Sequence, residues 1–206
     1  CVTVDPVDAR DFDDAVGARR LEGGGYELDV HIADVTHYVS PDSPVDNEAK
    51  RRTCSAYLVD RVIPMLPERL SNEVCSLVPG EDRLAMSVLM RLDERGRVRG
   101  FSATPSAIRS AARLDYDAVD AVLSGASRPE ELPCAPGDVE RVFLMLETLD
   151  EIRGLRELER RSRGAIDFES VEARVRLDEE GRPTGVSVRR RTRATGLIEE
   201  AMLLAN

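Results

Sequence analysis

The stretch Thr3-Val-Asp-Pro-Val-Asp-Ala-Arg-Asp-Phe-Asp-Asp-Ala-Val16 is the most informative part of this chain. Five carboxylates fall within the ten residues from Asp5 to Asp14, with one arginine among them. Like charges this close repel one another unless a cation neutralises them, and Mg²⁺ prefers oxygen ligands. Because apolar, β-prone segments adjoin the run, we expect the acids at the edge of a core. Taken alone, the run fits a metal site for phosphoryl-transfer chemistry and a solvated turn equally well.

An EF-hand calcium loop does not fit this run. Counted from Asp11, Asp13 falls on the third position, but Ala15 and Val16 occupy the fifth and sixth positions. The calcium loop needs an oxygen ligand at the fifth position and glycine at the sixth. This arrangement of acids therefore requires another explanation.

Alternating apolar residues predict strands on either side of the acidic run. A half-buried strand with four inward side chains is indicated by Tyr26, Leu28, Val30 and Ile32, which alternate with polar residues. Glycines 23–25 mark a tight turn before it. The acidic run therefore lies between an initial strand, Val2–Asp5, and this hairpin. Two further hairpins are predicted, one over Leu84–Leu92 and Arg97–Ser110, the other over Arg174–Leu177 and Val186–Arg190.

Helices are predicted where apolar residues recur at helical spacing. Asp138 is a suitable N-cap for an amphipathic helix of about 20 residues. Its apolar positions are Val139, Val142, Phe143, Leu146, Leu149, Ile152 and Leu155. A second helix begins near Leu197, residues 43–55 have helical tendency, and two prolines keep residues 62–67 extended or looped. We expect one α+β domain with a mixed or antiparallel sheet and packed helices.

Composition indicates a globular chain with an acidic balance. Of the 206 residues, 42% are apolar and 33% are charged, which is typical of globular proteins. No apolar run approaches the length of a membrane span, so no membrane partner is expected. The four cysteines lack a C-x-x-C pair, which favours free thiols in a reducing cytoplasm over a zinc site. The net charge of −10 argues against nucleic acid, but bound cations would reverse the local field around the acidic run.

Three more stretches accompany the acidic motif in order along the chain. They are His31–Val39, Tyr57–Leu77 (YLVDRVIPMLPERLSNEVCSL) and Leu197–Asn206 (LIEEAMLLAN). Together with Thr3–Val16 they resemble the RNB catalytic domain of the ribonuclease II family, over nearly the whole chain. Four ordered motifs are more specific than one, and they favour the metal site over the solvated turn. The resemblance implies that residues 1–206 form the N-terminal portion of this domain, with its C-terminal part and flanking oligonucleotide-binding barrels absent.

By position, four aspartates match the acidic catalytic residues of that family: Asp5, Asp11, Asp13 and Asp14. The resemblance implies processive 3′→5′ hydrolysis of single-stranded RNA to nucleoside 5′-monophosphates. Mg²⁺, or Mn²⁺, held by these aspartates would polarise the scissile phosphate and generate hydroxide, or one aspartate would orient the water. In an extended backbone Asp14 opposes Asp11 and Asp13, so convergence requires a turn. The fifth acid, Asp8, is expected to be a solvated loop residue.

The resemblance also assigns RNA contacts. Tyr57 matches a tyrosine near the 3′-terminal nucleotide, where stacking on a base tolerates any sequence; on residue type alone it would be a core tyrosine. Phe168 matches a second stacking aromatic, with core packing as an equal alternative. Glu199 matches a glutamate that holds the terminal ribose, and a carboxylate accepting a 2′-OH favours RNA over DNA. The adjacent Glu200 is the other candidate for that role.

Arginine dominates the basic residues, since Lys50 is the only lysine among 29. The dense patch Arg189–Arg193 suits phosphate contacts, and a solvated strand end explains it equally well. Where the family often has Arg-Asn-Asp-Ala-His, this chain has Arg191-Thr-Arg-Ala-Thr195, which puts two polar contacts in doubt. His31 and His37 are expected to be strand or loop residues, since neither pairs with a serine or cysteine in a triad-like motif.

The leading hypothesis is an exoribonuclease that acts on single-stranded RNA. A non-catalytic RNA-binding relative is the main alternative, and a Ca²⁺-binding structural module is a third. The family's catalytic arginine falls beyond Asn206, so we expect residues 1–206 alone to be weakly active or inactive. The last helix is expected to leave an apolar face of Leu197, Ala201 and Leu204 uncovered, which would favour self-association.

Overall fold

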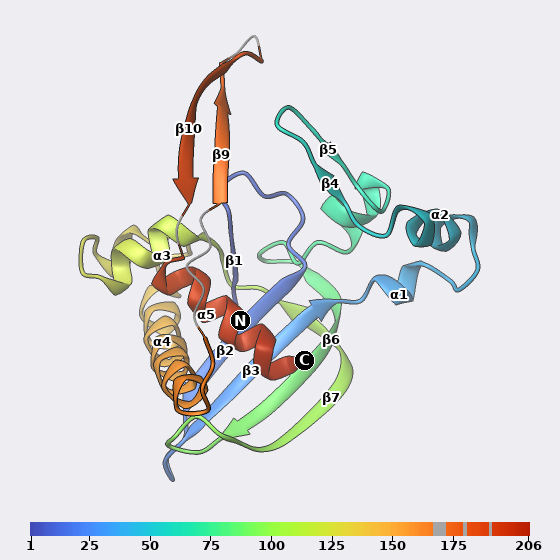
Figure 1. Cartoon of the computed structure of the whole chain (residues 1–206). Coiled ribbons are helices and arrows are strands. Elements are labelled where there is room, and N and C mark those ends of the chain that lie inside the picture. Colours follow the sequence, from blue (N-terminus) through green and yellow to red (C-terminus); the bar gives the residue numbers. More distant parts are fainter. Residues whose placement is uncertain (167–171, 179–180, 190) are drawn as a thin grey trace.

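The computed structural model describes residues 1–166, 172–178, 181–189 and 191–206 (Figure 1). At its centre is a four-stranded antiparallel sheet with strand order β2–β3–β6–β7. The strands are β2 (Asp14–Arg20), β3 (Tyr26–Ala33), β6 (Asp82–Leu92) and β7 (Val98–Arg109). Both hairpins predicted in this region are confirmed.

Glycine is required in the turn between β2 and β3. Gly25 has a φ of 78°, which side-chain-bearing residues rarely adopt. A Cβ at this position would lie 2.2 Å from the carbonyl oxygen of Leu92 on β6. The turn therefore closes against the neighbouring strand only because this residue has no side chain.

The burial expected for Ile32 on the inward face of β3 is wrong. Leu28 and Val30 are fully buried, but Ile32 is 39% exposed. Met86, its cross-strand partner on β6, is also exposed. The alternation of side chains continues along β3, but the helices do not cover this end of the sheet face. By contrast His31, one of the polar residues with which the apolar positions alternate, is buried.

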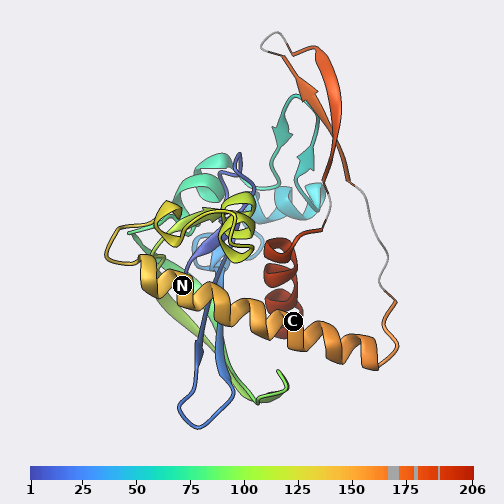
Figure 2. The same cartoon turned by 90° about the vertical axis from the view of Figure 1, so that its left-hand side faces the viewer.

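Three small strand pairs surround the central sheet. They are the parallel pair of β1 (Thr3–Asp5) with β8 (Arg113–Asp115), and two hairpins, β4 (Ala56–Tyr57) with β5 (Val62–Ile63) and β9 (Glu172–Leu177) with β10 (Pro183–Arg189). Short helices α1 (Val35–Tyr38) and α2 (Pro44–Arg52) precede β4, and a π-helical turn covers Arg69–Val74. The two hairpins project from the same end of the molecule (Figures 1 and 2).

Three helices pack beside the sheet, and Figure 2 shows the longest of them side-on. They are α3 (Tyr116–Leu123), α4 (Val139–Ser162) and α5 (Arg193–Ala205). The N-cap predicted for α4 is in the right place, but Asp138 does not cap through its side chain. Its carboxylate instead accepts a hydrogen bond from Arg141 at 2.7 Å.

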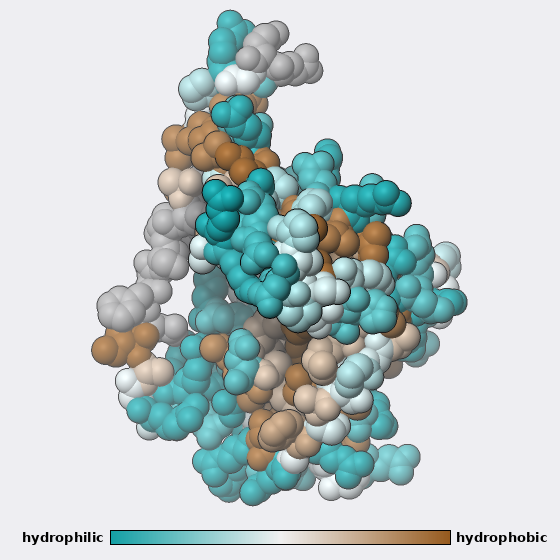
Figure 3. Space-filling view, turned by 90° about the vertical axis from the view of Figure 1, so that its right-hand side faces the viewer, coloured by the Kyte–Doolittle hydropathy of each residue, from teal (hydrophilic) through white to brown (hydrophobic). Residues whose placement is uncertain are grey.

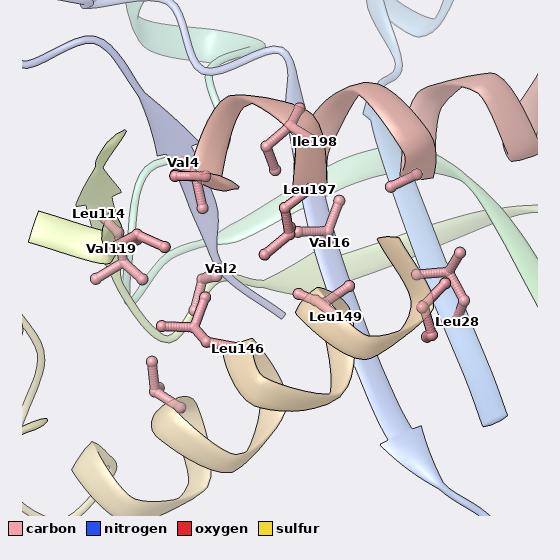
Figure 4. Packing of buried hydrophobic residues seen from close by; sticks show 14 of the residues in the cluster. Val2, Val4, Val16, Leu28, Leu114, Val119, Leu146, Leu149, Leu197 and Ile198 are labelled. Atoms are coloured by element: carbon pink, nitrogen blue, oxygen red, sulfur yellow. The ribbon is translucent and has the colours of Figure 1, made fainter. Parts of the chain in front are cut away.

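The main core lies between the sheet, α4 and α5, and Figure 4 shows its packing. Leu28 on β3, Leu146 on α4 and Leu197 on α5 are among its fully buried side chains. All three come from apolar positions that the sequence pattern identified. The uncovered face expected for α5 is therefore wrong, because Leu197 and Ala201 are both buried. The apolar face on which the expected self-association depended is therefore covered.

The surface is mainly hydrophilic on the face shown in Figure 3, where hydrophobic side chains form separate patches. An open cleft of about 830 Å³ lies between the two hairpins and is lined by Val59, Val175, Leu177 and Val186, among others. Within the described ranges, no helix combines the length and hydropathy needed to span a membrane.

Candidate active site

One loop, residues 6–13, connects the four predicted catalytic aspartates; we call it the aspartate loop. The four are Asp5 at the end of β1, Asp11 and Asp13 in the loop, and Asp14 at the start of β2. The backbone turns early in the loop, where the N–H of Ala9 donates to the carbonyl of Pro6 at 3.0 Å. This turn lies between Asp5 and Asp11, so it does not test the turn among residues 11–14 that convergence of Asp14 with Asp11 and Asp13 requires. Asp8 is exposed, as predicted.

Phe12 anchors the aspartate loop between two of the acids. Its side chain is buried in a second core cluster that includes Leu77. Its N–H donates to Oγ of Ser76 at 3.0 Å, and its carbonyl accepts from the N–H of Leu77 at 2.9 Å. Because adjacent side chains in an extended chain point to opposite sides, Asp11 and Asp13 lie away from this core.

Arg113 holds the other end of the aspartate loop from β8. Its Nη2 donates to the carbonyls of Pro6 and Val7 at 2.9 and 2.6 Å. The guanidinium carbon also lies 5.5 Å from the centroid of the Phe12 ring, within the range of a cation–π interaction. One arginine thus contacts both the turn and the anchor of the loop.

Burial and mutual repulsion raise the pKa of three of these carboxyls. Burial is the main cause for Asp5, where the charge of Asp14 adds to it and Arg113 opposes it, giving a pKa of about 7. Burial and the charge of Asp13 raise the pKa of Asp14 to about 6. The pKa of Asp13 is raised by burial and then by Asp11. A nearby cation would reverse these shifts, because it stabilises the charged form.

The donor set fits a hard divalent cation. Oδ2 of Asp5 is buried and has no hydrogen-bond partner, and a bound cation would satisfy it. In the part of the chain that the structure describes, no three acidic, histidine or cysteine side chains enclose a common point. Mg²⁺ usually takes only one or two carboxylates and completes its octahedron with water and substrate phosphates. The aspartates therefore fit an incomplete coordination shell.

Tyr57 lies beside this cluster. It belongs to β4 and is 71% exposed, so the alternative of a core tyrosine is excluded. Its pKa is raised by partial burial first and then by the charges of Asp11 and Asp13. An exposed aromatic ring next to the carboxylates is suitably placed to stack on a base. Phe168, the second predicted aromatic, lies outside the described residues.

Glu199 and Glu200 have different environments on α5. Glu199 is partly exposed and pairs with Nε of Arg191 at 2.8 Å. Glu200 is only 1% exposed, and its carboxylate lies 2.6 Å from Nη2 of Arg160 on α4. Only Glu199 is accessible to a ribose, which favours it over its neighbour for the predicted contact.

The arginine patch is partly engaged within the protein. Arg191 contacts Glu157 at 3.3 Å as well as Glu199, and Arg193 pairs with Asp150 and donates to the carbonyl of Leu123. These two arginines tie α5 to α3 and α4. These contacts give the two arginines a structural role, which neither interpretation of the patch anticipated.

Two other residues acquire roles that the sequence did not reveal. His31 lies in a strand, as predicted, and its Nδ1 lies 2.6 Å from Oγ of Ser87, with both side chains buried. The two residues are opposite each other in the β3–β6 register, which motif spacing does not reveal. His37 lies in the short helix α1 rather than in a strand or loop. Asp34 is the N-cap of α1 and accepts from the N–H of His37 at 3.1 Å.

Comparison with known proteins identifies the family. The RNB domain model matches residues 1–206, so the chain belongs to the RNB domain family. Ribonuclease R 1 of Lactococcus lactis is 45% identical over 206 residues, covering 99% of this chain and 24% of that protein. The chain thus spans about a quarter of the length of this relative. The sequence resemblance to the ribonuclease II family, and within it to ribonuclease R, is confirmed.

Solved structures agree with this assignment. The chain is similar to Mycoplasma genitalium RNase R in complex with ribose-methylated single-stranded RNA, with a TM-score of 0.92 and 36% identity over 100% of this chain and 31% of that one. It also shares its fold with yeast Ssd1, described as a pseudonuclease, with a TM-score of 0.63 and 24% identity over 77% of this chain and 18% of that one. The α+β fold predicted from the sequence is confirmed.

The pKa of Asp5 leads to a prediction about stability. Its folded pKa of about 7 exceeds the ordinary value of 3.8, so its stabilising contribution is complete below the ordinary value and is lost as pH rises through about 7. Without divalent cations, Asp5→Asn should therefore raise the unfolding temperature above pH 7, by roughly 2–4 °C for each kcal/mol in a chain of this size. Below pH 4 the gain should disappear. Thermal unfolding in the presence of a chelator measures the gain above pH 7 and its absence below pH 4. A gain that persists in acid would contradict the raised pKa of Asp5.

Proposed function

We propose that the protein is a Mg²⁺-dependent 3′→5′ exoribonuclease that degrades single-stranded RNA processively to nucleoside 5′-monophosphates. The observation that carries the proposal is the placement of all four family-motif aspartates around one anchored loop beside an exposed Tyr57. Membership of the RNB domain family supports it. The activity, the substrate and the direction of degradation are proposed for the whole protein, and they go beyond membership of the family.

The residues have distinct roles in this proposal. Asp5, Asp11, Asp13 and Asp14 would hold Mg²⁺, or Mn²⁺, and the chemistry such an ion supplies is polarisation of a scissile phosphate. Alternatively, three of them would hold the ion and the fourth would orient the attacking water and accept its proton, a role for which the raised pKa values of Asp5 and Asp14 are suited. Tyr57 stacks on any of the four bases. Glu199 accepts a hydrogen bond from the 2′-hydroxyl that distinguishes RNA from DNA.

A non-catalytic RNA-binding protein is the second candidate. The fold alone does not exclude it, because the pseudonuclease Ssd1 shares this fold. Retention of the complete acidic motif argues against it, since neighbouring carboxylates, three of them with raised pKa values, destabilise a protein that gains nothing from them. A calcium-binding structural module is the third.

An assay with end-labelled RNA separates the three candidates. The protein as its gene encodes it is incubated with a single-stranded oligoribonucleotide labelled at its 5′ end, with Mg²⁺, Mn²⁺, Ca²⁺ or a chelator. The proposal predicts progressive shortening from the 3′ end to mononucleotides with Mg²⁺ or Mn²⁺, and none with the chelator. RNA binding without shortening would support the non-catalytic relative. Thermal stabilisation by Ca²⁺ without cleavage under any condition would support the structural module.

A further inference from the structure

Ser76 bonds to the aspartate loop on both sides of Asp11. Its side chain is fully buried. Oγ accepts a hydrogen bond from the N–H of Phe12 at 3.0 Å and lies 3.4 Å from the carbonyl oxygen of Arg10, to which it can donate. One hydroxyl therefore fixes the peptide groups before and after a predicted metal ligand, without contacting its carboxylate.

Ser76 is itself anchored to the central sheet. Its carbonyl accepts from Nε of Arg83 on β6 at 3.0 Å, and Arg83 pairs with Glu81 at 2.8 Å. The next residue, Leu77, adds a backbone bond to the carbonyl of Phe12. The position of this half of the loop is thus set by β6 rather than by the loop's own sequence.

Arg113 restrains the opposite half of the loop. The β1–β8 register places it opposite Thr3, two residues before Asp5. Its Nη2 bridges the carbonyls of Pro6 and Val7, so the turn that follows Asp5 is tied to β8. A lysine at this position would keep the positive charge but lose the planar fork and its contact with the Phe12 ring.

We propose that Ser76 and Arg113 are positioning residues that hold the aspartate loop in its metal-binding conformation. The inference rests on the proposed function of the four aspartates. Carboxylates that repel one another move apart unless the backbone is restrained, and a functional constellation must be held to about 0.5 Å. The two side chains supply that restraint from β6 and β8, and neither is assigned a contact with the metal or the RNA.

Ser76→Ala tests the first restraint. The variant leaves the N–H of Phe12 buried and unpaired, which is costly enough to favour displacement of the loop. We expect the Mg²⁺ concentration for half-maximal effect to rise about tenfold and kcat at limiting Mg²⁺ to fall about tenfold, with KM for RNA unchanged. The Mg²⁺ dependence is measured by cleavage of single-stranded RNA and, independently of catalysis, by the Mg²⁺-induced rise in unfolding temperature.

Ser110→Ala is the matched control. Ser110 is equally buried, and its hydroxyl donates to the carbonyl of Ala112 at 3.0 Å, outside the aspartate loop. This variant should leave the Mg²⁺ dependence unchanged. An equal rise for Ser110→Ala would show a general effect of losing a buried hydroxyl and would overturn the proposal.

Arg113→Lys tests the second restraint. It also replaces Ser76→Ala as the test of the proposal if that variant does not fold. It should raise the half-maximal Mg²⁺ concentration in the same direction. Unchanged Mg²⁺ dependence in a folded Ser76→Ala or, failing that, in Arg113→Lys would overturn the proposal. If the unmodified protein does not cleave RNA, the proposed function fails, while the Mg²⁺-induced change in unfolding temperature still decides whether the two residues position the loop.

Discussion

Asp13→Asn is expected to lower kcat on single-stranded RNA by at least about two to three orders of magnitude, the usual loss when one electrostatic contact to a transition state is removed. Asparagine keeps the size of the side chain but removes the charge. The backbone anchor at Phe12 should be unaffected, because its bonds to Ser76 and Leu77 do not involve the Asp13 side chain. RNA affinity, measured by fluorescence anisotropy, should stay close to normal.

Asp8→Asn is the control for this experiment. Asp8 is exposed in the same loop, so the substitution changes the net charge equally without altering the four motif positions. Its kcat should be nearly normal. Normal cleavage by Asp13→Asn, or an equal loss in Asp8→Asn, would show that the acidic cluster has been assigned wrongly.

Arg160→Met is expected to destabilise the protein by about 3–5 kcal/mol, the cost of leaving one partner of a buried ion pair alone. Arg160 on α4 neutralises Glu200 on α5 across 2.6 Å. Burial already raises the pKa of Glu200, and Arg160 opposes that rise. Without the arginine the pKa should rise further, so stability should fall as pH rises through it. Urea unfolding in mildly acidic and mildly alkaline buffer measures the difference.

Two further variants identify the cause of that loss. Adding Glu200→Gln to Arg160→Met removes the buried charge and should recover much of the stability. Arg161→Met changes the exposed neighbouring arginine and should cost much less than Arg160→Met, because no buried charge is left alone. A large loss in Arg161→Met, or no recovery in the double variant, would indicate that helix propensity rather than the ion pair is responsible.

Local pattern was sufficient for most of the fold. The apolar spacing that begins at Val142 and Leu146 predicted α4, and alternation through Leu28 and Val30 predicted β3, because helix and strand periodicities are local properties. Exposure at the end of an element is not local. Ile32 continues the alternation of β3 but is exposed, since covering it depends on where other elements end. The face of α5 was misjudged for the same reason.

The candidate site was predictable only in part. The four aspartates and Tyr57 were found because the motifs contain them, and the structure places Tyr57 beside Asp11. Arg113 and Ser76 were missed as positioning residues, although Ser76 lies inside a quoted motif. They contact the loop over separations of 107 and 64 residues, and such pairing depends on strand register rather than on spacing in the sequence. The pairing of His31 with Ser87 was missed for this reason too.

Mg²⁺ binding by the aspartates is the central claim, and calorimetric titration of Mg²⁺ tests it most directly. The unmodified protein, Asp8→Asn and the double variant Asp11→Asn/Asp13→Asn are titrated under identical conditions in the presence of a non-hydrolysable single-stranded oligonucleotide. We predict saturable binding by the first two proteins and loss of that binding in the double variant. Unchanged Mg²⁺ binding by a folded double variant would contradict the account.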